Sequence, residues 1–224
     1  MSAIRYLAGM LVLLGTLQTA HANLLHTNLI HNGDAERGLA GWRTDGAIET
    51  VSYAAGGGFP TMQDPGPLQR GDSFFAGGVG AAAHATQTRS LAGLGKLIDA
   101  GALTFSLGAY LGGYASQNDH ARFTVRFLDV HRQSLGEFSL TGPSAMERGD
   151  RTGLWAVEGN GWVPVGARNA EFTLDLLRTA GSYNDGYADN LTFSLAPIPE
   201  PHSYALIGLG MIGLLFARRR RFPR

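Results

Sequence analysis

The chain has 224 residues, of which 44% are hydrophobic and 16% are charged, and its 18 basic residues balance 18 acidic ones. It has no cysteine, which excludes disulfides and thiolate metal sites. Residues 23–198 hold 12 Lys and Arg against 17 Asp and Glu, a net charge of −5. This balance argues against nucleic acid as a partner, because nucleic-acid binding needs a clustered basic face.

The first 22 residues have the parts of a secretory signal peptide. Arg5 supplies the positive charge, residues 6–17 form a short apolar segment, and Ala20-His21-Ala22 fits an A-x-A cleavage site. We therefore predict a signal peptide at residues 1–22 and a mature protein that begins at Asn23.

The body, residues 23–198, is long enough for one domain with its own core. Apolar and polar residues alternate, as in half-buried antiparallel strands, at residues 103–111, 122–127, 171–176 and 191–195. Shorter strands are expected at residues 48–53, 73–76, 85–91, 134–140 and 154–158. A helical turn or a loop is expected at residues 91–100. The pattern predicts an all-β fold, an antiparallel β-sandwich (jelly roll) of roughly eight to ten strands.

Two polar-aromatic loops of the body, at residues 116–119 and 182–187, bring amides and carboxylates together with nearby tyrosines. Sugar sites use an aromatic face for the apolar side of the ring, and amide and carboxylate groups for the hydroxyls. The candidate ligand-binding residues are Tyr110, Tyr114, Asn118, Asp119, Tyr183 and Asp185. The alternative is ordinary turn chemistry, because Asn, Asp, Ser and Gly are the usual loop residues.

No residue pattern of the body points to catalysis. Glycoside hydrolysis needs two positioned carboxylates, and nothing in the sequence selects a pair. The histidines are scattered, without the spacing of a zinc site. We predict that the protein is not an enzyme and has no catalytic residue.

The last 26 residues, 199–224, have three consecutive parts. Pro199-Glu200-Pro201 is followed by an apolar run at residues 204–217 and by Arg218-Arg219-Arg220-Arg221. A helix over this run is shorter than a hydrocarbon core of about 30 Å, and it enters a bilayer if the arginines reach the interface and the membrane thins. Because arginine-rich flanks stay on the cytoplasmic side, we predict export followed by anchoring through a hydrophobic C-terminal helix.

These three parts, in this order, resemble the PEP-CTERM sorting signal of Gram-negative bacteria. The resemblance implies that an exosortase recognises the motif residues and the arginines, and removes residues 199–224 after transient anchoring in the inner membrane. It also implies a destination at the cell surface or in the extracellular matrix, typically in producers of exopolysaccharide. The alternatives are a plain tail anchor and an apolar C-terminal helix of the core.

The two ends of the body carry a second resemblance. Residues 32–36 (NGDAE), with Gly41-Trp42, and residues 186–191 (GYADNL) resemble the end motifs of galactose-binding-like jelly rolls, which include many carbohydrate-binding modules. The resemblance implies that the first and last strands lie side by side and hold a structural Ca²⁺ ion, the one cofactor expected here. The implied metal ligands are Asp34, Glu36 and Asp189. The alternative is that these three are turn, surface and strand-end residues.

Together these observations predict an exported, non-catalytic protein of the cell surface or exopolysaccharide matrix that binds a glycan. A structural or adhesive matrix protein without a small ligand is the alternative, and a glycan-acting hydrolase has the least support. The expected partners are an exosortase, an extracellular polysaccharide and, before processing, the membrane.

Overall fold

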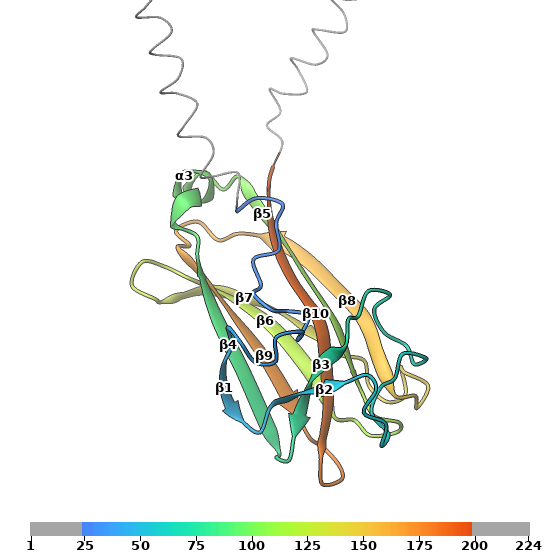
Figure 1. The fold of residues 1–224 in the computed structure, drawn as a ribbon. Helices are drawn as coiled ribbons and strands as arrows, with labels where there is room; N and C mark the ends of the chain where they lie inside the picture. Colours follow the sequence, from blue (N-terminus) through green and yellow to red (C-terminus); the bar gives the residue numbers. More distant parts are fainter. Residues whose placement is uncertain (1–23, 199–224) are drawn as a thin grey trace, which may run out of the picture.

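The computed structural model describes residues 24–198, which form a two-layer antiparallel β-sandwich (Figure 1). The strand orders are β1-β4-β9-β6-β7 in one sheet and β2-β3-β10-β5-β8 in the other. The predicted all-β sandwich is therefore confirmed. The signal peptide at residues 1–22 and the sorting segment at residues 199–224 lie outside the described residues.

The elements follow one another along the chain with these bounds: β1 Arg43–Gly46, β2 Glu49–Ser52, β3 Ser73–Gly78, β4 Ala82–Ser90, η1 Ala92–Leu94, α3 Gly95–Asp99, β5 Leu103–Gly113, β6 His120–Leu128, β7 Ser134–Thr141, β8 Gly153–Trp162, β9 Asn169–Leu177 and β10 Asn184–Pro197. Each of the nine predicted strands is present, and residues 91–100, for which a helical turn or a loop was expected, contain η1 and α3. Sequence reasoning missed β1, because all four of its residues are exposed and none is apolar.

The main core lies between the two sheets and combines phenylalanine rings with leucine and alanine side chains. The rings of Phe172 and Phe193, from opposite sheets, lie 4.9 Å apart, and those of Phe105 and Phe127 lie 5.2 Å apart. Burial of each such ring contributes about 1.5–3 kcal/mol. The alternating strand residues supply this core, since their apolar members face inward.

A second, smaller apolar layer covers the outer face of the β2-β3-β10-β5-β8 sheet. It is centred on Tyr53, Phe74 and Tyr187, with Phe59 and Tyr183 packed at its margin. The loop from residue 53 to residue 72 folds back over this face. Aromatic side chains therefore cover the outer face of this sheet at one end of the sandwich.

The N-terminal segment runs beside the last strand, whereas the end-motif resemblance implied that the first strand lies there. Leu25 forms a parallel bridge with Leu195, and the amide of Leu29 donates to the carbonyl of Phe193 at 2.8 Å. Gly33 passes so close to β10 that a Cβ there would lie 2.3 Å from the Leu191 carbonyl oxygen. The first strand, β1, pairs instead with β4. The contact between the chain ends is thus made by the segment before β1.

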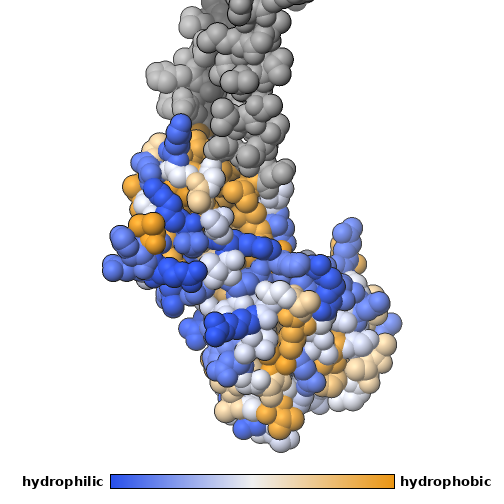
Figure 2. Space-filling view, turned by 60° about the vertical axis from the view of Figure 1, so that its left-hand side comes forward, coloured by the Kyte–Doolittle hydropathy of each residue, from blue (hydrophilic) through white to orange (hydrophobic). Residues whose placement is uncertain are grey.

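The outer face of the β1-β4-β9-β6-β7 sheet is polar and charged. His84 lies 2.6 Å from Asp175 across two strands. Arg126 lies 3.2 Å from Glu137 and 3.6 Å from Glu171. Figure 2, in which the side of β1 and β4 comes forward, shows hydrophilic residues over much of this surface.

Both ends of the described chain lie at one end of the sandwich (Figure 1). β5 links this end to the other, since Leu103 pairs with Pro197 near the C-terminal end and Gly112 pairs with Tyr187 at the far end. No helix within residues 24–198 is long and apolar enough to cross a membrane.

Candidate functional site

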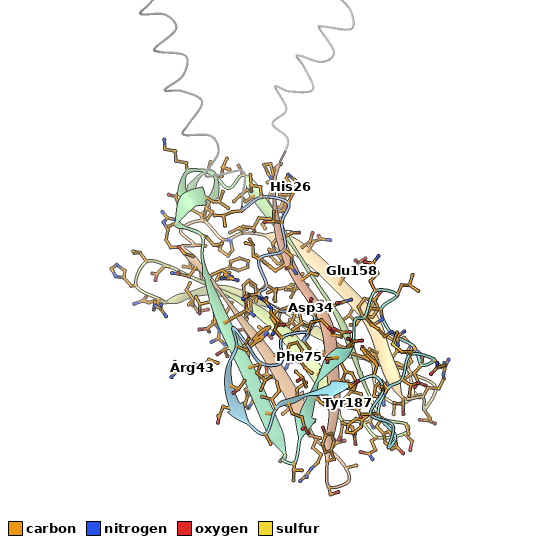
Figure 3. All side chains as sticks on the ribbon, viewed as in Figure 1. His26, Asp34, Arg43, Phe75, Glu158 and Tyr187 are labelled. Atoms are coloured by element: carbon orange, nitrogen blue, oxygen red, sulfur yellow. The ribbon has the colours of Figure 1, made fainter. Side chains whose placement is uncertain are left out.

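Aromatic rings and one carboxylate line a hollow of about 360 Å³ at the end of the sandwich away from the chain termini. The 53–72 loop contributes Phe59 with Gly57 and Gly58, and Tyr114 follows β5 directly. The remaining lining residues are Tyr183, directly before β10, and Asp185 and Tyr187, at the start of β10. We call this feature the aromatic hollow. Figure 3 shows Tyr187 at this end of the sandwich.

The walls of the aromatic hollow are fixed by ring packing. The ring of Phe59 meets that of Tyr183 edge-on at 5.3 Å, and the ring of Tyr187 meets that of Phe74 edge-on at 5.4 Å. The hydroxyl of Tyr183 donates to Glu49 at 2.8 Å. Such pairs add about 0.5–1.5 kcal/mol beyond burial, so the rings of the hollow are held in place before any ligand arrives.

Glycines allow the loop to pass over Tyr114. Gly58 has a φ of +96°, and a Cβ there would lie 2.9 Å from the Tyr114 ring. Gly56 and Gly57, whose φ values are +70° and +66°, face open space. Only glycine adopts these backbone angles without strain, which explains the run of three glycines beside the hollow.

Asp185 supplies the carboxylate of the hollow. Burial raises the pKa of Asp185, the hydrogen bond from the Tyr187 hydroxyl opposes this rise, and the charge of Asp119 adds to it. The carboxylate is half-buried among aromatic rings. It can accept hydrogen bonds from ligand hydroxyls, whereas the rings offer apolar faces.

The structure brings together three of the six predicted ligand residues. Tyr114, Tyr183 and Asp185 line the aromatic hollow. Tyr110 lines a neighbouring groove of about 520 Å³, on the same sheet face, with Asp34 and Glu158 (Figure 3).

Asp119 lies behind the hollow and positions the loop before β10, whereas Asn118 is exposed and bonds the segment between β7 and β8. Asp119 is fully buried, and its Oδ1 accepts hydrogen bonds from the amides of Thr179 at 2.6 Å and Ala180 at 3.0 Å. Its Oδ2 accepts from the amide of Asp185 at 3.0 Å. Asn118 Oδ1 accepts from the Ala145 amide at 3.0 Å. Contrary to the sequence expectation, the Asp119 side chain offers no surface to a ligand, because these protein donors surround it.

Two residues of the hollow, Phe59 and Tyr187, were not among the predicted ligand residues. Phe59 sits in a stretch without strand alternation, and only its place after three glycines marks it. Tyr187 lies within the closing motif at residues 186–191, which the sequence relates to the contact between the chain ends. Neither position reveals from sequence that the 53–72 loop folds back onto β10.

The three predicted calcium ligands lie near one another but do not form a preformed metal site. Glu36 Oε1 accepts hydrogen bonds from the amides of Asp72 at 2.8 Å and Ser73 at 2.9 Å. Fully buried Asp189 accepts from the Tyr53 hydroxyl at 2.7 Å. Within residues 24–198, no three His, Asp or Glu side chains are grouped so that they could hold a metal ion. The oxygen donors suit calcium chemically, and calcium binding stays a prediction.

Electrostatics also link the three predicted calcium ligands. Burial raises the pKa of Asp189 to about 7, the hydrogen bonds from Tyr53 and the Asn190 amide oppose the rise, and the charges of Glu36 and Asp34 add to it. Asp189 is therefore an acid that the fold keeps from ionising easily.

Comparison with protein families identifies the C-terminal segment. Residues 197–221 match the family described as the PEP-CTERM protein-sorting motif. The motif implies export and processing by an exosortase, as the sequence predicted. Among curated proteins, none is similar enough in sequence to count as a relative.

Comparison with solved structures concerns the body. A family 16 carbohydrate-binding module is 24% identical at a TM-score of 0.50, and the match covers 74% of this chain and 99% of that one. A family 61 module, solved with β-1,4-galactotriose, is 16% identical at a TM-score of 0.46, with 76% and 99% covered. The enzymatically active domain of bacteriophage CBA120 tailspike protein 4 is 20% identical at a TM-score of 0.49, with 75% of this chain but 21% of that chain covered. The chain thus carries a PEP-CTERM protein-sorting motif behind an all-β body that resembles carbohydrate-binding modules in fold.

Proposed function

We propose that the protein is a non-catalytic, glycan-binding component of the cell surface or exopolysaccharide matrix. The observation that carries this proposal is the aromatic hollow, in which preset rings surround one carboxylate. Ring faces stack on the apolar side of a sugar, and Asp185 accepts hydrogen bonds from its hydroxyls. The sorting motif supports the location, because it directs the chain to export.

A binding role fits the chemistry of the hollow better than hydrolysis does. Of the residues described as lining it, Asp185 alone has a carboxylate. Most glycoside hydrolases work with two carboxylates that flank the bond to be cleaved. The likeness in fold to binding modules is consistent with this proposal but fixes no activity.

The proposal is tested by co-sedimentation of residues 23–198 with the exopolysaccharide of the producing cells. Tyr183→Ala removes one wall of the hollow, and we expect the affinity to fall roughly tenfold. Trp162→Ala is the matched control, since this exposed ring lies at the opposite end of the β5-β8 pair. Circular dichroism and the Tm of each variant show whether the fold is kept.

Saturable binding that is weakened in Tyr183→Ala and kept in Trp162→Ala supports the proposal. If the folded wild-type protein does not bind the polysaccharide, glycan binding is wrong. A structural or adhesive role would then be the better account, and it would show as self-association that added sugar does not change.

A further inference from the structure

A second hollow, also of about 360 Å³, lies at the edge of the β1-β4-β9-β6-β7 sheet. It forms because β1 pairs only with Ala83–Thr86 of β4. The rest of β4 is left beside His31 and Gly41 of the N-terminal segment. We call this feature the basic groove, because three arginines and one acid line it: Arg43, Arg89, Arg132 and Glu171.

Among residues 24–198, the arginines of the basic groove form no ion pair with an acid. None of the ion pairs found within residues 24–198 includes Arg43, Arg89 or Arg132. The acid of the groove, Glu171, lies 3.6 Å from Arg126, a fourth arginine beside it. The groove therefore has an excess of positive charge on a body whose net charge is negative.

Two side chains of the groove are held in place by the N-terminal segment. The half-buried Arg89 donates from Nε to the Leu29 carbonyl at 2.8 Å, which fixes the guanidinium at the groove wall. His31 Nδ1 lies 3.2 Å from Arg37 Nη2.

Guanidinium groups gathered around one hollow repel one another, and each donates hydrogen bonds in a planar fork that matches a carboxylate or sulfate. An anion in the groove would remove the repulsion and accept those bonds. We propose that the basic groove binds the negatively charged oxygens of an acidic polysaccharide. This inference shares with the proposed function only that the ligand is a glycan.

The basic groove and the aromatic hollow belong to different sheets. The hollow is built on β10 and on the chain end of β5, whereas the groove is built on β1, β4 and β9. Figure 3 shows Arg43 on the side of the sandwich away from Glu158. A long acidic chain can therefore be held at two separate places, by stacking at one and by charge at the other.

The test measures binding of the exported protein to polygalacturonate, dextran sulfate and unsubstituted dextran, at low and at high salt. Arg43→Gln and Arg132→Gln each remove one charge from the groove, and we expect each to weaken acidic-polymer binding roughly threefold to fivefold at low salt. Arg151→Gln is the control, because it removes one exposed charge next to β8 of the other sheet. High salt should weaken binding in the wild type, through screening.

Tighter binding of either acidic polymer than of dextran, with losses confined to the two groove variants, supports the inference and shows whether carboxylate or sulfate is preferred. Equal binding of acidic and neutral polymers overturns it, and so does an equal loss in Arg151→Gln. The proposed function fails separately, if Tyr183→Ala binds the producing cells' polysaccharide as well as the wild type does.

Discussion

The degree of burial distinguishes the roles of three aspartates, Asp119, Asp185 and Asp189. Asp119, just before β6, is fully enclosed, whereas Asp185, at the start of β10, faces the aromatic hollow. Asp189 is also fully buried, and its negative neighbours disfavour its charge further. At the scale of residues, sequence identifies the chemistry of a side chain but does not show whether that side chain reaches solvent.

The raised pKa of Asp189 predicts that stability falls as pH rises. In the folded state the pKa is about 7, against 3.8 as the usual value. Between these values the folded state binds more protons than the unfolded state does, so stability present below about pH 4 is lost progressively up to pH 7. We expect the part of the loss due to Asp189 to be on the order of 2–4 kcal/mol, and this part to be removed in Asp189→Asn. Urea unfolding at a series of pH values measures it.

The same titration shows whether Asp189 is responsible. Asp185, whose pKa is also raised by burial, gives the same sign and remains in the Asp189→Asn variant. The difference between wild type and variant therefore isolates Asp189. Parallel pH curves for the two proteins would show that Asp189 is ionised at the same pH in the folded and unfolded states.

At the scale of elements, short polar contacts hold the loops to the sheets. Asp119, just before β6, binds the 178–183 loop that joins β9 to β10. Glu36, in the N-terminal segment, binds two amides at the start of β3. These contacts hold in place the segments on both sides of the aromatic layer, although Asp119 and Glu36 are not aromatic.

Asp119→Asn should loosen the loop between β9 and β10. The carboxylate accepts four hydrogen bonds, from three donors on Oδ1 and one on Oδ2. In the Asp119→Asn variant the side-chain NH₂ would face backbone or hydroxyl donors in place of one carboxylate oxygen. This leaves a buried donor unsatisfied, at a cost of about 1–3 kcal/mol in the free energy of unfolding. We expect this loss in urea unfolding, together with weaker glycan binding.

Asp129→Asn is the control for this variant. Asp129 also accepts two backbone amides, from His131 and Gln133, but at an exposed hairpin. Water can replace the lost acceptor there, so the cost should stay well below that of Asp119→Asn. Equal losses in the free energy of unfolding for the two variants would contradict the role of Asp119 as a buried acceptor that holds the loop between β9 and β10.

Calcium is proposed to act where the N-terminal segment meets β10. An ion bound by Asp34, Glu36 and Asp189 would join the chain ends, and a ligand of the folded state must stabilise it. We expect residues 23–198 to melt at a higher Tm in excess calcium than in EDTA, and Asp189→Asn to lose this difference. An identical wild-type Tm in both conditions would rule out a structural calcium ion.

At the scale of the whole molecule, the aromatic hollow and the chain termini lie at opposite ends of the sandwich. β5 spans the distance between them, since Leu103 pairs near the C-terminal end and Gly112 pairs with Tyr187. Eleven residues of extended strand reach about 35 Å. A protein held by its C-terminal segment would thus present the hollow away from the point of attachment.

This arrangement predicts how the protein tolerates insertions. A folded domain fused after Ile198 should leave glycan affinity unchanged, because the fusion point is at the far end from the hollow. The same domain inserted between Gly56 and Gly57 should abolish binding, because this loop carries Phe59 into the hollow. Co-sedimentation compares the two proteins. Loss of binding in the C-terminal fusion would place the glycan site elsewhere.

Sequence by itself determined the fold class, nine of the ten described strands and the sorting motif. These features depend on local patterns, namely the two-residue alternation of strands and the fixed order of the tail. The candidates that it selected from polar-aromatic loops include Tyr114, Tyr183 and Asp185, which line the aromatic hollow. β1 could not be predicted from sequence, because it has no apolar residue. Only its pairing with β4 makes it a strand.

Tertiary structure alone decided which residues share a site. Phe59 and Tyr187 are 128 positions apart, yet the 53–72 loop brings them to one hollow. The same folding buries Asp119 and gathers the arginines of the basic groove from three separate strands and loops. Such groupings depend on long-range packing and desolvation, which arise only when distant segments meet, and local sequence patterns carry no record of them.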